Sequence, residues 1–130
     1  MSAYASPNVL DNGLNYIKSN CDKMALVSAY TPGDSYATVT AAILAEVTMT
    51  TTDFTLGTSG SDRTCTSAAG KQDASANATG GSATNHIVFL YTGNTEVLWV
   101  TSETSGQTVT SGNPVNFPSL VYTAKQPTVV

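Results

Sequence analysis

The chain has 130 residues, and hydroxyl groups largely replace charges in it: it holds 21 Thr and 14 Ser, while only 11% of the residues are charged. Coiled coils and helical bundles need Glu and Lys on their exposed faces, so this composition argues against both. It also argues against disorder, because 41% of the residues are hydrophobic and the net charge is only −4.

The basic residues are few and scattered: Lys18, Lys23, Arg63, Lys71 and Lys125. Affinity for nucleic acid depends on neutralising several phosphates, so we expect no nucleic-acid partner. We expect no membrane partner either, since no apolar run of about 18 residues is present. Residues 1–7 have neither the basic nor the apolar region of a secretory signal, so we expect no export by the general secretory route.

The first predicted element is a helix over residues 7–23. Ser6 can cap its free amides, and Pro7 suits the first helical position. Asp11 is expected in or near the first turn, and Lys18 and Lys23 late in the helix, where the helix dipole favours each charge. Apolar residues recur every three or four positions and form one stripe: Leu10, Leu14, Ile17, Cys21 and Met24.

This stripe must pack against another apolar surface, because an isolated helix of this length is only marginally stable in water. Two alternatives stay open: the sheet of the same domain, or another protein chain. A polar arm over residues 1–8 precedes the helix, and Tyr4 within it has no apolar partners nearby in the sequence. The candidate contacts to a protein partner are therefore Ser2, Tyr4, Pro7, Leu10, Leu14 and Ile17.

After Met24 the pattern changes from helical to β. The turn sequence 31–35 closes a first predicted strand, and Gly, Ser and Asn separate the later ones. Strands are predicted over 24–30, 47–51, 63–68 and, weakly, 73–79, whereas 38–45 fits a helix or a strand and 53–56 a strand or a loop.

The strongest β pattern is a hairpin. Its arms, His86–Tyr91 and Glu96–Thr101, are joined by residues 92–95, which are centred on Gly-Asn. Both arms are almost continuously apolar, which is typical of strands in the middle of a sandwich. Further strands are predicted over 107–111 and 117–122, and Pro118 in the last implies an edge or a bulge.

Short strands at regular intervals predict a mainly β fold. We expect a β-sandwich or small barrel of about seven or eight antiparallel strands, preceded by one N-terminal α-helix. The expected organisation is a single β-rich domain over residues 9–122, with the arm before it and a tail over residues 123–130.

The sequence carries little that indicates catalysis. Its one histidine, His86, opens the best strand, and no Gly-x-Ser-x-Gly motif accompanies it. No spacing of His, Cys or carboxylates indicates a metal site, and no glycine-rich loop indicates a phosphate-bearing cofactor. We therefore expect no catalytic, metal or cofactor residues and no enzyme. Four aromatic residues could form either a sugar-binding face or core packing: Phe89, Tyr91, Trp99 and Tyr122.

Two cysteines, Cys21 and Cys65, match neither a zinc pattern nor a Cys-x-x-Cys redox pair. Free cysteine behaves as a small hydrophobe, so two buried thiols are one interpretation. A disulfide bridge within the chain or between subunits is the other.

One segment carries a resemblance to a known group: Val9-Leu10-Asp11-Asn12-Gly13-Leu14-Asn15-Tyr16-Ile17. It resembles the opening of a group of small tailed-bacteriophage virion proteins. In that group a short helix of the form Leu-Asp-x-Gly-Leu-x-x-Ile precedes a Thr/Ser-rich β-domain. Further parallels in order and composition lie at 25–28, 62–66, 83–88 and 108–112.

The resemblance implies a structural protein of a phage virion. From the β-body, the polar arm and the striped helix we expect it on the outer capsid surface, after assembly in the bacterial host cytoplasm. A capsid decoration (cement) protein needs a compact β-body and an adhesive arm, and many copies let weak contacts suffice. We expect the major capsid protein as partner, and self-association as a homotrimer or another oligomer. A tail- or fibre-associated protein is the first alternative, and a carbohydrate-binding module on the virion surface is the second.

Overall fold

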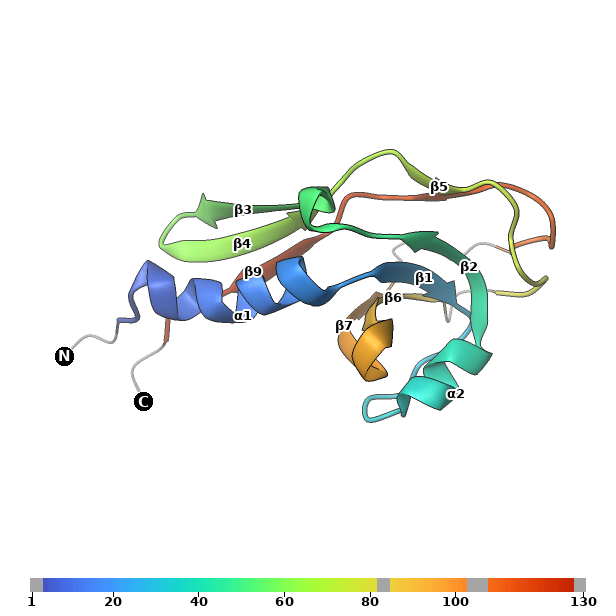
Figure 1. Cartoon of the computed structure of the whole chain (residues 1–130), viewed down its shortest axis with the longest axis horizontal. Helices are drawn as coiled ribbons and strands as arrows, with labels where there is room; N and C mark the ends of the chain where they lie inside the picture. Colours follow the sequence, from blue (N-terminus) through green and yellow to red (C-terminus); the bar gives the residue numbers. More distant parts are fainter. Residues whose placement is uncertain (1–3, 82–84, 103–107, 128–130) are drawn as a thin grey trace. The chain divides into compact units, whose positions relative to one another are not determined.

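The computed structural model describes residues 4–81, 85–102 and 108–127, and it shows a mainly β chain (Figure 1). In these residues nine strands form antiparallel sheets, and a long N-terminal helix precedes them. The expected fold class is therefore confirmed. The chain divides into two compact units, which are unit 1 (Met1–Asn20, Thr50–Ala69 and Pro118–Val130) and unit 2 (Cys21–Met49 and Gly70–Phe117).

Unit 1 is a helix packed on a three-stranded sheet. The sheet order is β3-β4-β9, and the helix α1 contacts all three strands. Its elements are α1 (Pro7–Asn20), the 3-10 turn η1 (Thr51–Asp53), β3 (Phe54–Ser59), β4 (Asp62–Ser67) and β9 (Val121–Ala124). The last strand is distant in sequence, so unit 1 brings both ends of the described chain together: the Ala5 N–H donates to Gln126 Oε1 at 2.8 Å.

Unit 2 is built around a four-stranded sheet of order β2-β1-β6-β7. A two-stranded sheet, β5-β8, belongs to the same unit. Its elements are β1 (Lys23–Val27), α2 (Tyr36–Ala41), β2 (Ile43–Thr48), β5 (Lys71–Asp73), β6 (His86–Tyr91), the 3-10 turn η2 (Thr92–Asn94), β7 (Glu96–Ser102) and β8 (Val115–Phe117). The central strands β1 and β6 hold the core, and their residues 24–27 and 87–90 are all buried.

The helix and hairpin predictions come close to the structure. α1 starts at Pro7, and the Ser6 hydroxyl accepts the Val9 N–H at 3.4 Å. The predicted end at residue 23 is wrong, because the helix stops at Asn20, whose side-chain amide donates to the Tyr16 carbonyl oxygen. The arms of the hairpin are β6 and β7, and their connection is residues 92–95 as predicted.

The two arms of this hairpin differ in how deeply they are buried. β6 lies between β1 and β7, whereas β7 is at the edge of the sheet. None of the residues of β7 is fully buried. The interpretation of Glu96–Thr101 as a central strand is therefore wrong, because a continuous apolar run does not distinguish an edge from a centre.

The ambiguous segment 38–45 contains both a helix and a strand. Ser35 caps α2 by accepting the Thr38 N–H at 3.2 Å. Six residues later the helix ends at Ala41, and β2 starts at Ile43. The strand predicted over 47–51 is thus displaced, since β2 ends at Thr48 and η1 begins at Thr51.

Three predicted strands of the Thr/Ser-rich segments are also wrong in part. Within 73–79 only Asp73 is in a strand, because its carboxylate accepts the Ser75 N–H at 3.0 Å and turns the chain. The segment 107–111, of which Gln107 lies outside the described residues, contributes one isolated bridge at Val109. The strand predicted over 117–122 is interrupted at 118–120, where Ser67 binds the N–H of Leu120.

Candidate interaction surface

The helix α1 has an inner and an outer face. Leu14 and Ile17 are buried, with 0% and 7% of their surface exposed, and α1 contacts the sheet of its own unit. Val9 and Tyr16 are 63% and 45% exposed. These two are seven residues apart, which is close to two full turns, so they lie on the same outer side of the helix.

The predicted partner contacts are divided between these faces. Tyr4 and Pro7 are exposed, and Leu10 is half-buried. Leu14 and Ile17 pack within unit 1, which was one of the two alternatives that the sequence left open. Ser2 lies outside the described residues. The residues left for a partner are therefore those at the helix start and on its outer side, rather than the apolar stripe.

Strand β9 adds an aromatic residue beside the helix. In the antiparallel register Tyr122 is opposite Cys65 and Ala124 is opposite Arg63. Opposed residues share a sheet face, and Arg63 of this set binds Asp11 of α1. Tyr122, 39% exposed, is thus on the face that carries α1, whereas Val121 is on the other face.

We call Tyr4, Val9, Tyr16 and Tyr122 the helix-side surface. Together with Val121 they are the large apolar residues that are exposed in the described chain, and all five belong to unit 1. Val9 and Tyr16 are not among the predicted contacts, because they lie outside the apolar stripe of the helix. Their spacing of seven residues was the available signal.

The charged side chains of Asp11, Lys18 and Arg63 bind other groups of unit 1. Arg63 Nε donates to Asp11 Oδ1 at 2.8 Å, and Arg63 Nη2 donates to Asp11 Oδ2 at 3.2 Å. This bidentate pair joins α1 to β4, and the hydrogen bond that Arg63 donates to Asp11 raises the pKa of the Arg63 guanidinium. Lys18 Nζ donates to the carbonyl oxygens of Thr51 and Phe54.

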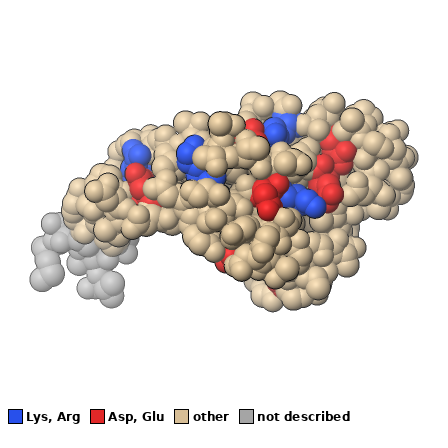
Figure 2. Space-filling model, viewed as in Figure 1, with Lys and Arg blue, Asp and Glu red and all other residues tan. Residues whose placement is uncertain are grey.

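Asp11 and Lys18 were expected to interact with the helix dipole, but both bind groups outside the helix. Asp11 lies beyond the first turn, which holds no acidic residue, and its partner is a strand rather than the helix dipole. Lys18 is in the last turn as predicted, but its ammonium group binds η1 and β3. The expectation for Lys23 is wrong, because the helix ends at Asn20 and Lys23 is the first residue of β1. Figure 2 shows the charged side chains of one face as small mixed groups, separated by wide uncharged areas.

The four aromatic residues considered for sugar binding do not form one exposed face. Phe89 is 0% exposed and stacks on Trp99, with ring centroids 4.4 Å apart. Trp99 and Tyr91 are half-buried on the same hairpin. His86, the single histidine, is half-buried and tilted against Tyr30, with ring centroids 5.9 Å apart. The Phe89 and Trp99 rings therefore pack against each other.

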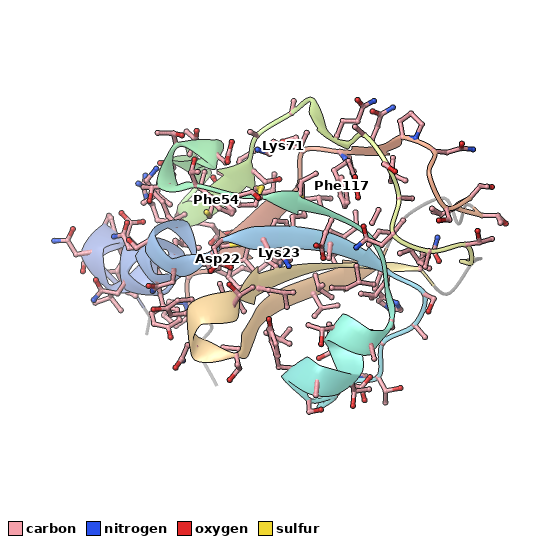
Figure 3. The ribbon with its side chains drawn as sticks, turned by 45° about the vertical axis from the view of Figure 1, so that its right-hand side comes forward. Asp22, Lys23, Phe54, Lys71 and Phe117 are labelled. Atoms are coloured by element: carbon pink, nitrogen blue, oxygen red, sulfur yellow. The ribbon has the colours of Figure 1, made fainter. Side chains whose placement is uncertain are left out.

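An open groove of about 540 Å³ lies in unit 2, between β2 and residues 70–74. Its wall carries Glu46, Lys71 and Asp73; Figure 3 labels Lys71, together with Lys23 on β1. Glu46 Oε2 is 3.3 Å from Lys23 Nζ, and Asp73 Oδ2 accepts the Glu46 N–H at 2.9 Å. Both carboxylates are thus bound by the chain itself.

Neither Cys21 nor Cys65 forms a disulfide, and both side chains are buried. Burial raises the pKa of the Cys65 thiol, and the positive charge of Lys18 offsets part of that effect. The structure thus contains the thiol form of the two interpretations. A buried thiol with a raised pKa is a poor nucleophile, because the thiolate is the reactive species.

We therefore expect neither cysteine of the native chain to react readily with a disulfide reagent at pH 8, and both to react once the chain is unfolded. Ellman's reagent with and without guanidinium measures this, and intact mass under non-reducing conditions is the control. Rapid modification of two thiols in the native protein, or a mass lower by two hydrogens, would contradict buried free thiols.

Asp22 holds the connection of the β6–β7 hairpin (Figure 3). Its Oδ1 accepts the Thr92 N–H at 2.9 Å, and its Oδ2 accepts the Thr92 hydroxyl at 2.7 Å. Burial, the largest single influence, opposes ionisation. The hydrogen bonds from Thr92 and from the Gly93 N–H together outweigh it and hold the pKa of Asp22 below its ordinary value.

Asp22→Asn is expected to lower the free energy of unfolding at pH 7 by about 1–3 kcal/mol, because it removes the charge from these hydrogen bonds. The lowered pKa stabilises the folded state above about pH 4, the unfolded value, and this contribution disappears as the pH falls through the folded value. Urea titrations at pH 7, 5 and 3 measure it. Thr92→Val removes the hydroxyl donor and should lose part of the same free energy of unfolding. If wild type and Asp22→Asn differed in free energy of unfolding by the same amount at all three pH values, this account would be refuted.

The described residues contain no group of three or more His, Cys, Asp or Glu that could hold a metal ion. None of the described helices is long and apolar enough to span a membrane. Comparisons with protein-family models, with curated proteins and with solved structures gave no match. The geometry of unit 1 and the motif on α1 are therefore the basis for a functional proposal.

Proposed function

We propose that the chain is a structural protein of a tailed-phage virion, a decoration protein that binds the outside of the major capsid shell and stabilises it. One observation carries the proposal: the large apolar side chains exposed in the described residues all belong to unit 1, and Val9 and Tyr16 among them lie on the helix whose motif resembles virion proteins. An exposed apolar group of this kind is typical of a surface that docks on another protein.

The charges of unit 1 favour the same role. Asp11 and Arg63 neutralise each other, and Lys18 is bound to backbone oxygens. The exposed residues of α1 are all uncharged, and three of them are Asn. Many copies on one shell would repel one another little, and their number would add avidity to a weak contact. Self-association, as a homotrimer or another oligomer, would strengthen it further.

The helix-side surface predicts a specific pair of variants. Val9→Ala combined with Tyr16→Ala should weaken binding to shells of the major capsid protein about tenfold or more, because both side chains would lose buried contacts at the interface. Binding is measured by co-sedimentation of the purified chain with shells that lack it. Val121→Ala is the control, since Val121 is 52% exposed, a value between those of Tyr16 and Val9, but lies on the other sheet face.

Cryo-EM of virions that contain the chain decides its position. Density at capsomer junctions in many copies supports the decoration role. Copies confined to the tail would reject it in favour of the tail- or fibre-associated alternative. Full binding of the double variant, beside full binding of the control, would leave a decoration role possible but would exclude the helix-side surface as its contact.

A further inference from the structure

Gln126, which follows β9, is joined to two other segments of unit 1 by four hydrogen bonds. Its side chain exchanges two of them with the N-terminal arm: the Ala5 N–H donates to Oε1 at 2.8 Å, and Nε2 donates to the Ala5 carbonyl oxygen at 2.9 Å. Nε2 also donates to the Ser61 carbonyl oxygen at 3.1 Å, and the Gln126 N–H donates to Asp62 Oδ1 at 2.8 Å.

The amide of Gln126 binds Ala5 as a neighbouring strand would. Two opposed residues of an antiparallel pair exchange an N–H and a carbonyl hydrogen bond in this way. Here the side-chain carboxamide supplies both the acceptor and the donor. Gln126 is half-buried and is tied to the end of the β3–β4 hairpin. The arm is therefore attached to unit 1 at residue 5, before the helix begins at Pro7.

Tyr4 directly precedes this attachment and is 74% exposed. A flexible segment loses conformational freedom when it forms a contact, and this loss weakens binding. Because Ala5 is already held, the backbone beside Tyr4 needs less ordering when a partner binds. Tyrosine is also among the residues that contribute most to binding at protein interfaces. The attachment therefore prepares Tyr4 for a contact without covering its ring.

We propose that Gln126 is a latch that fixes the arm to unit 1 and so positions Tyr4 for contact with a partner. The latch is a property of the free chain. The contact made by Tyr4 rests on the proposed function, the binding of the capsid shell through the helix-side surface. Gln126 is thus a positioning residue, and its loss should weaken binding only while Tyr4 is present.

The latch is tested in the free chain. Gln126→Ala removes three side-chain hydrogen bonds, so exchange of the Ala5 amide, measured by NMR, should accelerate about tenfold or more. Exchange of the amides in 7–20 should not change. Gln72→Ala is the control, because it removes a glutamine hydrogen bond in unit 2, that from Gln72 Nε2 to Asn116 Oδ1. It should leave exchange of Ala5 as in wild type.

Two results would overturn the latch. Unchanged exchange of Ala5 in Gln126→Ala would show that the arm is not held there. Equal acceleration in 7–20 would show that Gln126 stabilises unit 1 as a whole. If Gln126→Ala does not fold, Gln126→Asn takes its place: it keeps the amide but shortens the side chain by one methylene group, so it should accelerate exchange of Ala5 in the same way.

The positioning of Tyr4 is tested by a double-mutant cycle, with co-sedimentation on shells of the major capsid protein as the measurement. Gln126→Ala should weaken binding about fivefold in the chain that has Tyr4, and less than about twofold in Tyr4→Ala. Unchanged binding, or equal weakening in both backgrounds, would overturn the positioning role alone. A wild type that binds no shells would reject the proposed function and the Tyr4 contact together, while exchange of Ala5 would still decide the latch.

Discussion

Phe89→Ala is expected to lower the free energy of unfolding by about 3–5 kcal/mol, the largest effect of any single truncation considered for this chain. Phe89 is 0% exposed. It is opposite Met24 on one side and opposite Trp99 on the other, and it stacks on the Trp99 ring. Removing the ring leaves a cavity between these neighbours that the two flanking strands, each paired to β6, can close only in part.

Small domains have a total stability of about 5–15 kcal/mol, so this loss would remove a large share of it. Urea denaturation followed by Trp99 fluorescence measures the change directly, because Trp99 is the single tryptophan. Tyr4→Ala is the control: Tyr4 is 74% exposed, and its truncation should change stability by less than about 0.5 kcal/mol. If the two variants lost similar amounts, Phe89 would not be in the core.

Leu14→Ala is expected to cost about 2–5 kcal/mol, because Leu14 is completely buried where α1 packs on the sheet of unit 1. The same change tests the assignment of the helix faces. If the apolar stripe docked on a partner instead, truncation of Leu14 would leave the isolated chain nearly as stable as before.

Val9→Ala on the outer face is the matched control for Leu14→Ala. Val9 is 63% exposed, and Ala is the better helix former, so this variant should be as stable as wild type or slightly more stable. Hydrogen exchange of the amides in 7–20 resolves the effect within unit 1. Faster exchange for Val9→Ala than for Leu14→Ala would mean that the two faces are exchanged.

The two Ala variants of α1 therefore separate folding from binding. Leu14 is needed for the helix to pack on its sheet, whereas Val9 and Tyr16 are exposed on the outer side of the helix. We expect Leu14→Ala to lose stability first and binding as a consequence. The Val9 and Tyr16 variants should lose binding alone.

Much of the local structure was predictable from short-range signals. Ser6 and Pro7 mark the helix start, and the spacing of Leu10, Leu14 and Ile17 marks its inner face. The arms of β6 and β7 follow from two apolar runs around a Gly-Asn connection. These signals depend on residues within a few positions of one another, so they survive without any knowledge of the fold.

The Thr/Ser-rich segments were harder to predict. Hydroxyl and carboxylate side chains can bind nearby backbone groups and so compete with strand pairing. At Asp73 and Ser67 such hydrogen bonds turn or interrupt the chain where the residue pattern predicts strand. The composition that excluded helical bundles is thus also what makes the strand ends uncertain.

A mainly β chain with one capped N-terminal helix and a central hairpin can be predicted from the residues alone, because periodicity and turn residues are local properties. Three features follow only from the three-dimensional arrangement of the described residues: the edge position of β7, the Asp11–Arg63 pair and the hydrogen bonds of Asp22 to Thr92. The same arrangement places Val9 and Tyr16 at the surface. These features depend on pairing between residues far apart along the chain, and such pairing is set by how whole strands and helices pack.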